Sequence, residues 1–285
     1  MASTPIKQRY VGEINIIAEL YTFIQTVPGW TVDKYVTDTE LYIHNTSSVD
    51  AEIGYWSFAQ DAASTYRGTL KRYANTGFNT SNAVDAQPGV LENITEVAYH
   101  YVDYTYNGMK CLVDFIANEE FLVIYTIVPD AQIVFTTSLL YSGVAAKAYS
   151  WSAGGPVIYG SQRSATSVPY YALYFDDGTT GAQWYTSENG VFSGYELAVN
   201  YIQYSTADGV QFSKADNSFK FYPFELFVEY DGGYAPVGYI PYMWYAQDPY
   251  GNISNTSIIR MGGNEYSNYW ITGSADTRHI WSGVV

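Results

Sequence analysis

The hydrophobic positions near the start of the chain recur with the spacing of an α-helix. Between residues 10 and 27, apolar side chains form two rows, each with steps of three and four residues. The first row contains Tyr10, Ile14, Ile17, Tyr21 and Ile24, and the second contains Ile16, Leu20, Phe23 and Val27. Because residues three and four apart share a helix face, the two rows predict one amphipathic helix with a broad apolar side. We expect that side to pack on a sheet or a partner subunit, and Pro28 and Gly29 to end the helix before an extended segment from Trp30.

Further along, the pattern changes to short apolar runs separated by Gly, Asn and Asp. Residues 99–106 and 111–116 flank Asn107-Gly108, a pair that tolerates the positive φ of a tight turn, and this arrangement predicts a hairpin. Residues 117–120 predict another turn. The continuous apolar run at 121–128 predicts a central strand that is covered on both faces.

Turn signals recur through the second half of the chain. They are Asp176-Asp177-Gly178, Glu188-Asn189-Gly190, Ala207-Asp208-Gly209, Asp231-Gly232-Gly233 and Gly262-Gly263-Asn264. Between them, residues 170–175, 219–230 and 267–272 predict strands. The sequence therefore predicts a mainly β fold of antiparallel sheets, sandwich or barrel-like, with one N-terminal amphipathic helix.

A stretch rich in Ser, Gly and Ala at residues 150–167 suggests a boundary or a long loop. We therefore divide the chain into an N-terminal helix with an antiparallel β region (1–150) and a second β-rich region (151–285). A single continuous domain is the alternative, because length is only a soft guide to domain number.

Aromatic residues outnumber charged ones. The chain has 31 Tyr, 18% aromatic residues and 14% charged residues. Tyr and Trp are enriched at protein interfaces, where charged residues are depleted, so this composition indicates assembly or recognition. The alternative is that the rings fill the core of a β-rich fold. The net charge of −15 disfavours nonspecific binding to nucleic acid, and no apolar run is long enough to span a membrane.

The residue types of common active sites do not form a motif. The three histidines, His44, His100 and His279, are widely spaced, and no nucleophile elbow or P-loop is present. Glu119-Glu120 and Asp176-Asp177 are adjacent carboxylates of the kind a glycosidase would need, but their positions predict solvated turns. We therefore expect no enzyme, no cofactor and no bound metal.

Five short sequence motifs occur in an order that is typical of one protein family. They are Pro28-Gly29-Trp30, Phe115-Ile116-Ala117-Asn118-Glu119, Tyr141-Ser142-Gly143-Val144, Tyr234-Ala235-Pro236-Val237-Gly238-Tyr239-Ile240 and Arg260-Met261-Gly262-Gly263-Asn264-Glu265-Tyr266. Together they resemble a family of virion structural proteins of tailed bacteriophages, described as tail, neck or baseplate components. The resemblance implies a virion protein that is assembled in the host cytoplasm and held by contacts with other virion proteins and with copies of itself. It carries over no catalytic motif.

The candidate contact segments are the N-terminal helix and residues 234–250. The candidate interface lies in the second segment, together with one arginine near the C-terminus. Its members are Tyr234, Pro236, Tyr239, Pro241, Tyr242, Trp244, Tyr245 and Arg260. Prolines restrict the chain and would reduce the ordering cost of docking. A loop packed within the fold is an equal alternative for the segment, and an ordinary surface ion pair is the alternative for the arginine.

Two other functions remain open at this point. Exposed rings could stack on sugars, which would make the chain a glycan-binding receptor module of the tail, with Trp151, Trp184 and Trp244 as candidates. A glycosidase or depolymerase is the third hypothesis, and it depends on the paired carboxylates.

Overall fold

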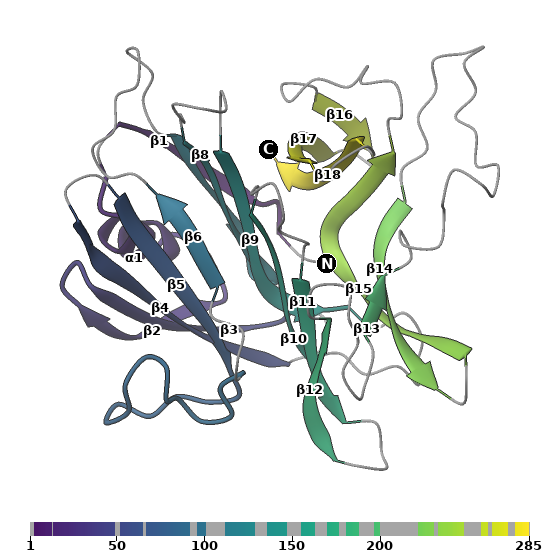
Figure 1. Cartoon of the computed structure of the whole chain (residues 1–285), viewed down its shortest axis with the longest axis horizontal. Helices are drawn as coiled ribbons and strands as arrows, with labels where there is room; N and C mark the ends of the chain where they lie inside the picture. The colour runs from purple at the N-terminus through teal and green to yellow at the C-terminus, as the bar shows by residue number, and fades with distance from the viewer. Residues whose placement is uncertain are drawn as a thin grey trace.

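The structure is a computed structural model of the whole chain, and its elements are traced in Figure 1. It describes residues 3–12, 14–48, 52–64, 67–91, 96–100, 112–128, 136–146, 155–162, 170–176, 181–187, 197–199, 222–230, 233–247, 258–261, 264–272 and 277–284. Within these ranges the chain forms one helix, α1 (Ile16–Ile24), and three antiparallel sheets. The mainly β fold that the sequence predicts is confirmed.

The five-stranded sheet follows chain order. Its strands are β2 (Trp30–Val36), β3 (Glu40–Thr46), β4 (Ile53–Ser64), β5 (Arg67–Asn75) and β6 (Glu96–His100). Successive strands pair as antiparallel neighbours, so this sheet is a simple meander.

The seven-stranded sheet begins with the N-terminal strand and then follows the middle of the chain. Its order is β1 (Ile6–Val11), β7 (Leu112–Asn118), β8 (Phe121–Val128), β9 (Thr136–Ala145), β10 (Gly155–Gln162), β11 (Tyr170–Asp176) and β12 (Ala182–Ser187). The pairing of β9 with β10 joins strands from both sides of residue 150. The division of the chain at that residue stays a prediction, and one sheet draws strands from both regions.

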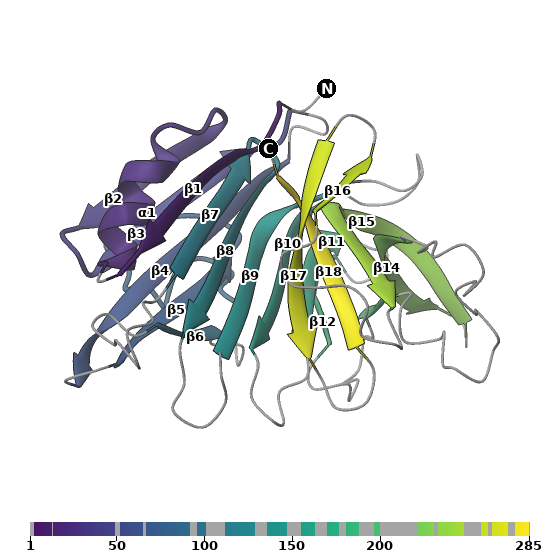
Figure 2. The ribbon, with the colours of Figure 1, turned by 90° about the horizontal axis from the view of Figure 1, so that it is seen from above.

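The six-stranded sheet is built from the C-terminal part. Its order is β13 (Leu197–Val199), β14 (Tyr222–Tyr230), β15 (Gly233–Gln247), β18 (Thr277–Val284), β17 (Asn264–Thr272) and β16 (Ile258–Met261). Figures 1 and 2 show the seven-stranded sheet between the other two sheets. The described strands thus form three layers.

Side chains alternate across β8 and bury both of its faces. Leu122 and Ile124 belong to the core that the seven-stranded sheet shares with α1 and the five-stranded sheet. Phe121, Val123 and Tyr125 alternate with them along the strand and are also buried, and Phe121 contacts a ring of β15. The prediction of a central, doubly covered strand at 121–128 is confirmed.

The N-terminal helix is shorter than its sequence pattern predicts. The predicted buried rows are confirmed at Ile16, Ile17, Leu20, Phe23 and Ile24. The start at residue 10 is wrong, because Tyr10 lies in β1, opposite Val113, and its ring packs on Phe115 at 5.5 Å between centroids. The helix begins after Asn15, whose side chain accepts a hydrogen bond from the Ala18 amide at 2.9 Å.

The predicted hairpin around Asn107-Gly108 is wrong where it can be compared. The turn itself lies outside the described residues. Residues 96–100 form β6, which pairs with β5, whereas residues 112–118 form β7, which pairs with β1 and β8. Non-local pairing with β1 takes the place of the local partner that the sequence suggested.

The other predicted strands are confirmed as β11, β14 and β17. Glu188-Asn189-Gly190 and Ala207-Asp208-Gly209 lie outside the described residues. The remaining three turn signals fall between strands that pair as antiparallel neighbours, with Asp176 opposite Ala182, Tyr230 opposite Gly233, and Met261 opposite Asn264. Among the described residues, no helix has the length and apolar character to cross a membrane.

Candidate functional site

The turn between β7 and β8 holds the densest polar cluster that the hydrogen bonds of the described residues reveal. Asn118 pairs with Phe121, so Glu119 and Glu120 form the two-residue connection. The Asn118 side chain accepts a hydrogen bond from the Glu120 amide at 2.9 Å, which is the local bond that Asn commonly makes in turns. All three polar residues are buried.

The Glu119 carboxylate is bonded to the N-terminal segment and to the chain after β3. It accepts hydrogen bonds from the Ser3 amide at 2.6 Å, from the Ser3 hydroxyl, and from the Ser48 hydroxyl at 3.4 Å. The Glu119 carbonyl accepts one from the Asn45 amide group at 2.7 Å. The Asn118 side chain returns a bond to the Ser3 carbonyl at 2.9 Å. These bonds fix the start of the chain on the turn.

The Glu120 carboxylate accepts its hydrogen bonds from Ser47 and Ser48, which follow β3. The Ser47 hydroxyl donates to one oxygen at 2.6 Å, and the Ser48 amide and hydroxyl donate to the other at 2.8 and 2.7 Å. The Glu120 carbonyl accepts from the Val144 amide at 3.0 Å. The turn is therefore tied both to the end of β3 and to β9.

Gly29 and Trp30 pack against the same turn. The Trp30 indole N–H donates to the Asn118 carbonyl at 2.6 Å. Gly29 has φ 79°, and a Cβ placed there would lie 2.6 Å from the Cβ of Glu119. The Gly29 carbonyl accepts from the Thr46 amide at 3.1 Å. Glycine is required here both for its backbone conformation and for close contact.

The prediction that Glu119 and Glu120 are solvated turn residues is wrong. The turn is where the sequence predicts it, but the donors come from Ser3, Ser47 and Ser48, far away in the chain. A buried carboxylate needs such donors, because an unpaired one is costly. The two carboxylates stabilise the fold, because their hydrogen bonds connect the β7–β8 turn to the N-terminal segment and to the end of β3. Asp176 is the last residue of β11, and Asp177 lies outside the described residues.

Burial by itself raises the pKa of Glu119, but hydrogen bonds from the Ser3 hydroxyl, backbone amides and the Ser48 hydroxyl outweigh it and leave the pKa below the ordinary 4.5. A carboxyl with a lowered pKa in the folded state adds stability above its unfolded pKa, and this stability is lost as the pH falls through the folded pKa.

We expect Glu119→Gln to lower the free energy of unfolding by about 2 kcal/mol at pH 7, since hydrogen bonds to a charged group are lost. The difference from the unmodified protein should shrink as the pH falls below 4.5, where the wild-type carboxylate itself becomes protonated. Urea unfolding at a series of pH values measures both effects. Glu52→Gln removes one carboxylate without touching the turn and controls for net charge. A difference that stays constant across the acid range would contradict this role for Glu119.

A second contact region joins β9 of the seven-stranded sheet to β15 of the six-stranded sheet. Ala146 and Tyr239 exchange two backbone hydrogen bonds, both of 3.0 Å. Two glycines allow close packing in this region, Gly143 of β9 against the β7–β8 turn and Gly238 of β15 against the end of β9. A Cβ on Gly143 would lie 2.7 Å from the Glu120 carbonyl oxygen, and one on Gly238 would lie 2.9 Å from the Ala146 carbonyl oxygen. Gly238 thus lets β15 approach β9, whereas Gly143 lets β9 approach the β7–β8 turn.

Aromatic rings fill the space beside this junction. Phe121 stacks on Tyr141, with 5.6 Å between centroids and 6° between planes, and it meets Tyr242 at 5.1 Å. Tyr242 has φ 60°, in the left-handed region that side chains other than glycine rarely adopt. It lies where the pairing of β14 with β15 shifts register between Pro223 and Phe224. This bulge carries the ring toward the seven-stranded sheet.

The candidate interface residues lie mostly in β15. Seven of them, Tyr234, Pro236, Tyr239, Pro241, Tyr242, Trp244 and Tyr245, fall within this strand, and Arg260 lies in β16 opposite Glu265. The alternative of a packed loop is wrong for residues 233–247, because these residues form a strand that pairs with β14 and β18. Pro236 and Pro241 adjoin its two register shifts, where a sheet tolerates proline.

The exposure of these side chains differs where the structure describes it. Tyr239 is 39% exposed, Pro241 is buried, and Tyr242 and Trp244 are half-buried. The side chains of Tyr234, Pro236, Tyr245 and Arg260 lie outside the described set. Tyr239 alone among the described candidates offers a substantial surface to a partner, and the interface assignment stays a prediction.

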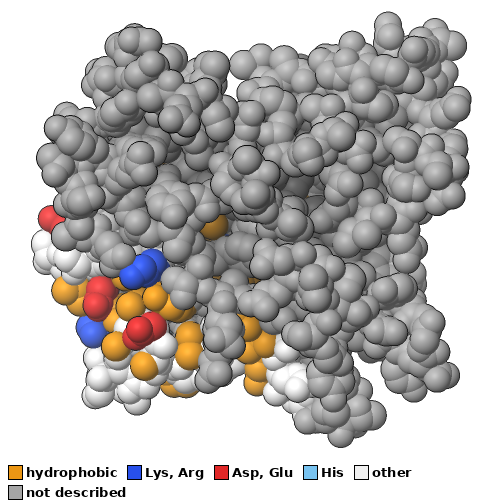
Figure 3. Space-filling view, in the orientation of Figure 1, with side chains coloured by type: hydrophobic (Ala, Val, Ile, Leu, Met, Phe, Trp, Pro, Cys, Tyr) orange, Lys and Arg blue, Asp and Glu red, His pale blue; other side chains and the backbone are white. Residues whose placement is uncertain are grey.

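The described rings serve internal packing more than an outer surface. Those of Tyr42, Trp56, Phe58, Phe115, Phe121, Tyr125 and Tyr141 are buried. Among the described residues, the exposed large hydrophobic side chains are Ile6, Val11, Val36, Ile53 and Tyr239, of which one is aromatic. In the coloured part of Figure 3, hydrophobic side chains are interspersed with charged ones. Other described rings, among them Tyr21, Trp30, Tyr35 and Trp184, are half-buried, so filling of the core explains only part of the aromatic composition in this part of the chain.

The glycan candidates and the histidines give no second site in the described structure. The Trp184 indole N–H donates to the Gly89 carbonyl at 2.9 Å, its ring packs near Tyr174, and Trp151 lies outside the described residues. His44 bonds Asp33 through Nδ1 at 2.9 Å. In the part of the chain that the structure describes, no group of three His, Cys, Asp or Glu side chains is placed to hold a metal ion.

No protein-family model matches the sequence, and no curated protein matches it. The resemblance to phage virion proteins therefore stays a prediction, and the fold and the polar turn are described on their own terms.

Proposed function

We propose that this chain is a structural component of a tailed-bacteriophage particle, in its tail, neck or baseplate, and that it catalyses no reaction. The observation that supports this proposal most is that residues from the motifs that resemble those of phage virion proteins pack against one another in the fold. Gly29, Trp30 and Gly143 lie against the β7–β8 turn, while Gly238 allows β15 to approach β9. Residues distant in sequence thus serve one architectural purpose, which suits a protein that acts as a rigid part.

The occupied carboxylates of Glu119 and Glu120 also favour an architectural role over a catalytic one. A general acid or nucleophile must reach its substrate, and here Glu119 accepts hydrogen bonds from the amide and hydroxyl of Ser3, while Glu120 accepts three from Ser47 and Ser48. These bonds link the N-terminal segment, the five-stranded sheet and the seven-stranded sheet into one body. A protein of this kind would contact other virion proteins and its own copies, and its net charge of −15 makes nucleic acid a poor partner.

A nonsense codon in the reading frame tests the proposal during infection of a non-suppressing host. We expect incomplete particles by electron microscopy, and complete infectious particles when the intact chain is supplied from a plasmid. Complete, infectious particles that form without the chain would overturn the proposal. Particles of complete form that fail to adsorb would overturn it in favour of the glycan-binding alternative.

A further inference from the structure

The N-terminal strand β1 lies on β7 through a continuous antiparallel ladder. Each of its six residues, from Ile6 opposite Ala117 to Val11 opposite Leu112, has a partner on β7. Four of the six side chains are exposed and two are half-buried, whereas the described buried members of the neighbouring core begin at Ile16. β1 therefore covers a core that later parts of the chain build.

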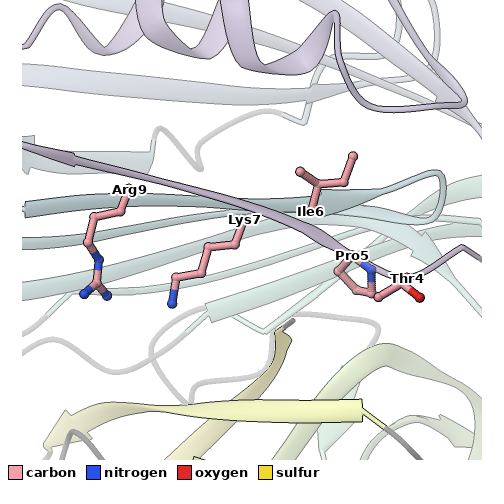
Figure 4. Close-up of a pocket in the computed structure, with 5 residues that line it drawn as sticks. All are labelled: Thr4, Pro5, Ile6, Lys7 and Arg9. Carbon is pink, nitrogen blue, oxygen red and sulfur yellow. The ribbon is translucent and has the colours of Figure 1, made fainter.

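Two buried carboxylates take hydrogen-bond donors from the N-terminal segment. Asp114 of β7, whose side chain is 1% exposed, accepts from Nε and Nη2 of Arg9, both at 2.7 Å, and the Lys7 ammonium lies 3.6 Å from one of its oxygens. Figure 4 shows Lys7 and Arg9 on the same side of β1. Beyond the other end of the ladder, Glu119 accepts from the amide and hydroxyl of Ser3.

These contacts define a site that is specific for the N-terminal segment. We call residues 112–119, which are β7 and the start of its turn, the β1 site. A buried carboxylate that loses its donors is costly, so the β1 site favours a strand that places a serine and an arginine where β1 places them. The backbone ladder alone would accept many sequences, but Asp114 and Glu119 select this one.

A short connection separates β1 from a helix that is fixed on the body of the protein. Gly12 directly follows β1 and has φ 112°, a backbone angle that other residues rarely adopt. Asn15 accepts from the Ala18 amide at 2.9 Å and donates to the Asp38 carbonyl at 3.0 Å, which fixes the start of α1. A terminal strand joined through a short hinge to a fixed element is the arrangement in which identical copies exchange that strand.

We propose that residues 3–11 are an exchangeable arm, and that in assemblies of this protein the arm of one copy occupies the β1 site of a second copy. The second copy is the occupant that the site fits, because it brings the same Ser3, Lys7 and Arg9 to Asp114 and Glu119 in the same register. The inference rests on the proposed function, since it names one contact by which a structural protein would join its own copies.

Exchange requires no new side-chain contact, because the bonds of the closed chain are formed again between two copies. What decides between the closed and the exchanged form is therefore the hinge and the concentration of neighbouring arms. Copies held side by side in a particle present their arms to one another at a high effective concentration. Assembly thus favours the exchanged form.

Cysteine pairs across the ladder test the exchange directly. Antiparallel partners lie about 4.5–5.5 Å apart at Cα, within the range that a disulfide spans. Chains with Ile6→Cys and chains with Ala117→Cys, both also carrying Cys111→Ser, are unfolded, mixed and refolded together at a series of protein concentrations, then oxidised. We expect a disulfide between the two kinds of chain, in a fraction that rises with concentration. Val11→Cys with Leu112→Cys is a second pair, at the other end of the ladder.

Val36→Cys, used in place of Ile6→Cys, is the matched control. Both residues are 38% exposed, but Val36 lies on β2 opposite Glu40 of β3. It should give no linked product above background. The double variant Ile6→Cys/Ala117→Cys should close within one chain when it is refolded at high dilution. Circular dichroism checks that each variant is folded. Absence of the interchain disulfide for both pairs at every concentration would overturn the inference.

Gly12→Ala separates exchange from an ordinary structural role of the arm. The positive φ disfavours alanine in the closed chain, and an extended hinge removes this cost in the exchanged form. We expect the association constant, measured by sedimentation equilibrium of the refolded chain, to rise at least roughly tenfold. An unchanged or smaller constant would contradict the exchange. Neither experiment bears on whether the chain is needed for complete particles, so the two proposals fail separately.

Discussion

Gly29→Ala is expected to lower the free energy of unfolding by about 3 kcal/mol. The residue has φ 79°, and its Cβ would lie 2.6 Å from the Cβ of Glu119 and 3.1 Å from its Cα. The left-handed backbone contributes about 1–2 kcal/mol of this loss, and overpacking contributes about 1–3 kcal/mol. Relief of the contact would displace the β7–β8 turn, so the hydrogen bonds of Glu119 would weaken as well.

Gly181→Ala is the matched control for this substitution. Gly181 has φ 82°, close to that of Gly29, but a Cβ there would meet nothing within 4 Å. We expect it to cost only the backbone component, about 1–2 kcal/mol. Urea unfolding of both variants gives the difference. Equal losses in the two variants would mean that Gly29 is not packed against the turn.

Arg72→Ala is expected to lower the free energy of unfolding by about 4 kcal/mol, the second large effect. Arg72 lies on β5 and is only 1% exposed. Its guanidinium donates to the Tyr141 carbonyl and, at 2.8 Å, to the Ser142 hydroxyl, both on β9. Truncation removes these bonds between the five-stranded and seven-stranded sheets and leaves a cavity in their shared core.

Arg72→Met separates the two contributions, because methionine fills much of the space without donating a hydrogen bond. We expect it to restore roughly half of the loss, leaving about 2 kcal/mol for the missing charge-assisted bonds. Thermal and urea unfolding of the two variants measure the effects. A loss below about 1 kcal/mol for Arg72→Ala would contradict the burial of this side chain between the sheets.

Local patterns predicted those parts of the fold whose partners are close in sequence. The run at 121–128 and the turn before it form β8 and its hairpin with β7, because a short connection places the two strands side by side. The predicted helix is too long because one residue of the pattern, Tyr10, pairs with a strand that is distant in sequence. Tyr10 has helical spacing from Ile14, but its partner is Val113 on β7, and pairing across the sheet decided its structure.

The polar turn could be located from sequence, but its burial could not. Two adjacent acids between two apolar strands predict a turn wherever it lies. The donors that allow Glu119 and Glu120 to be buried are Ser3, Ser47 and Ser48, and nothing in the spacing of these serines distinguishes them. A useful signal was the recurrence of glycine in the five sequence motifs, since Gly29, Gly143 and Gly238 each border a close backbone or Cβ contact.

The candidate interface shows the limit of composition as evidence. Prolines and aromatic rings in residues 234–250 favour a docking segment or a packed loop, and both were plausible from sequence. Pairing with β14 and β18 makes residues 233–247 a strand, in which prolines adjoin the irregular positions and Tyr242 turns inward onto Phe121. Rings that look suited to a partner can be used by a neighbouring sheet of the same chain.

The number of copies of this chain in each purified phage particle tests the proposed function most directly. Quantitative mass spectrometry with an isotope-labelled standard of the chain, calibrated against a virion protein of known copy number, measures it. A structural component should be present at a fixed whole number of copies that survives repeated purification. Absence from mature particles, or an amount that varies between preparations and declines on washing, would contradict the proposal.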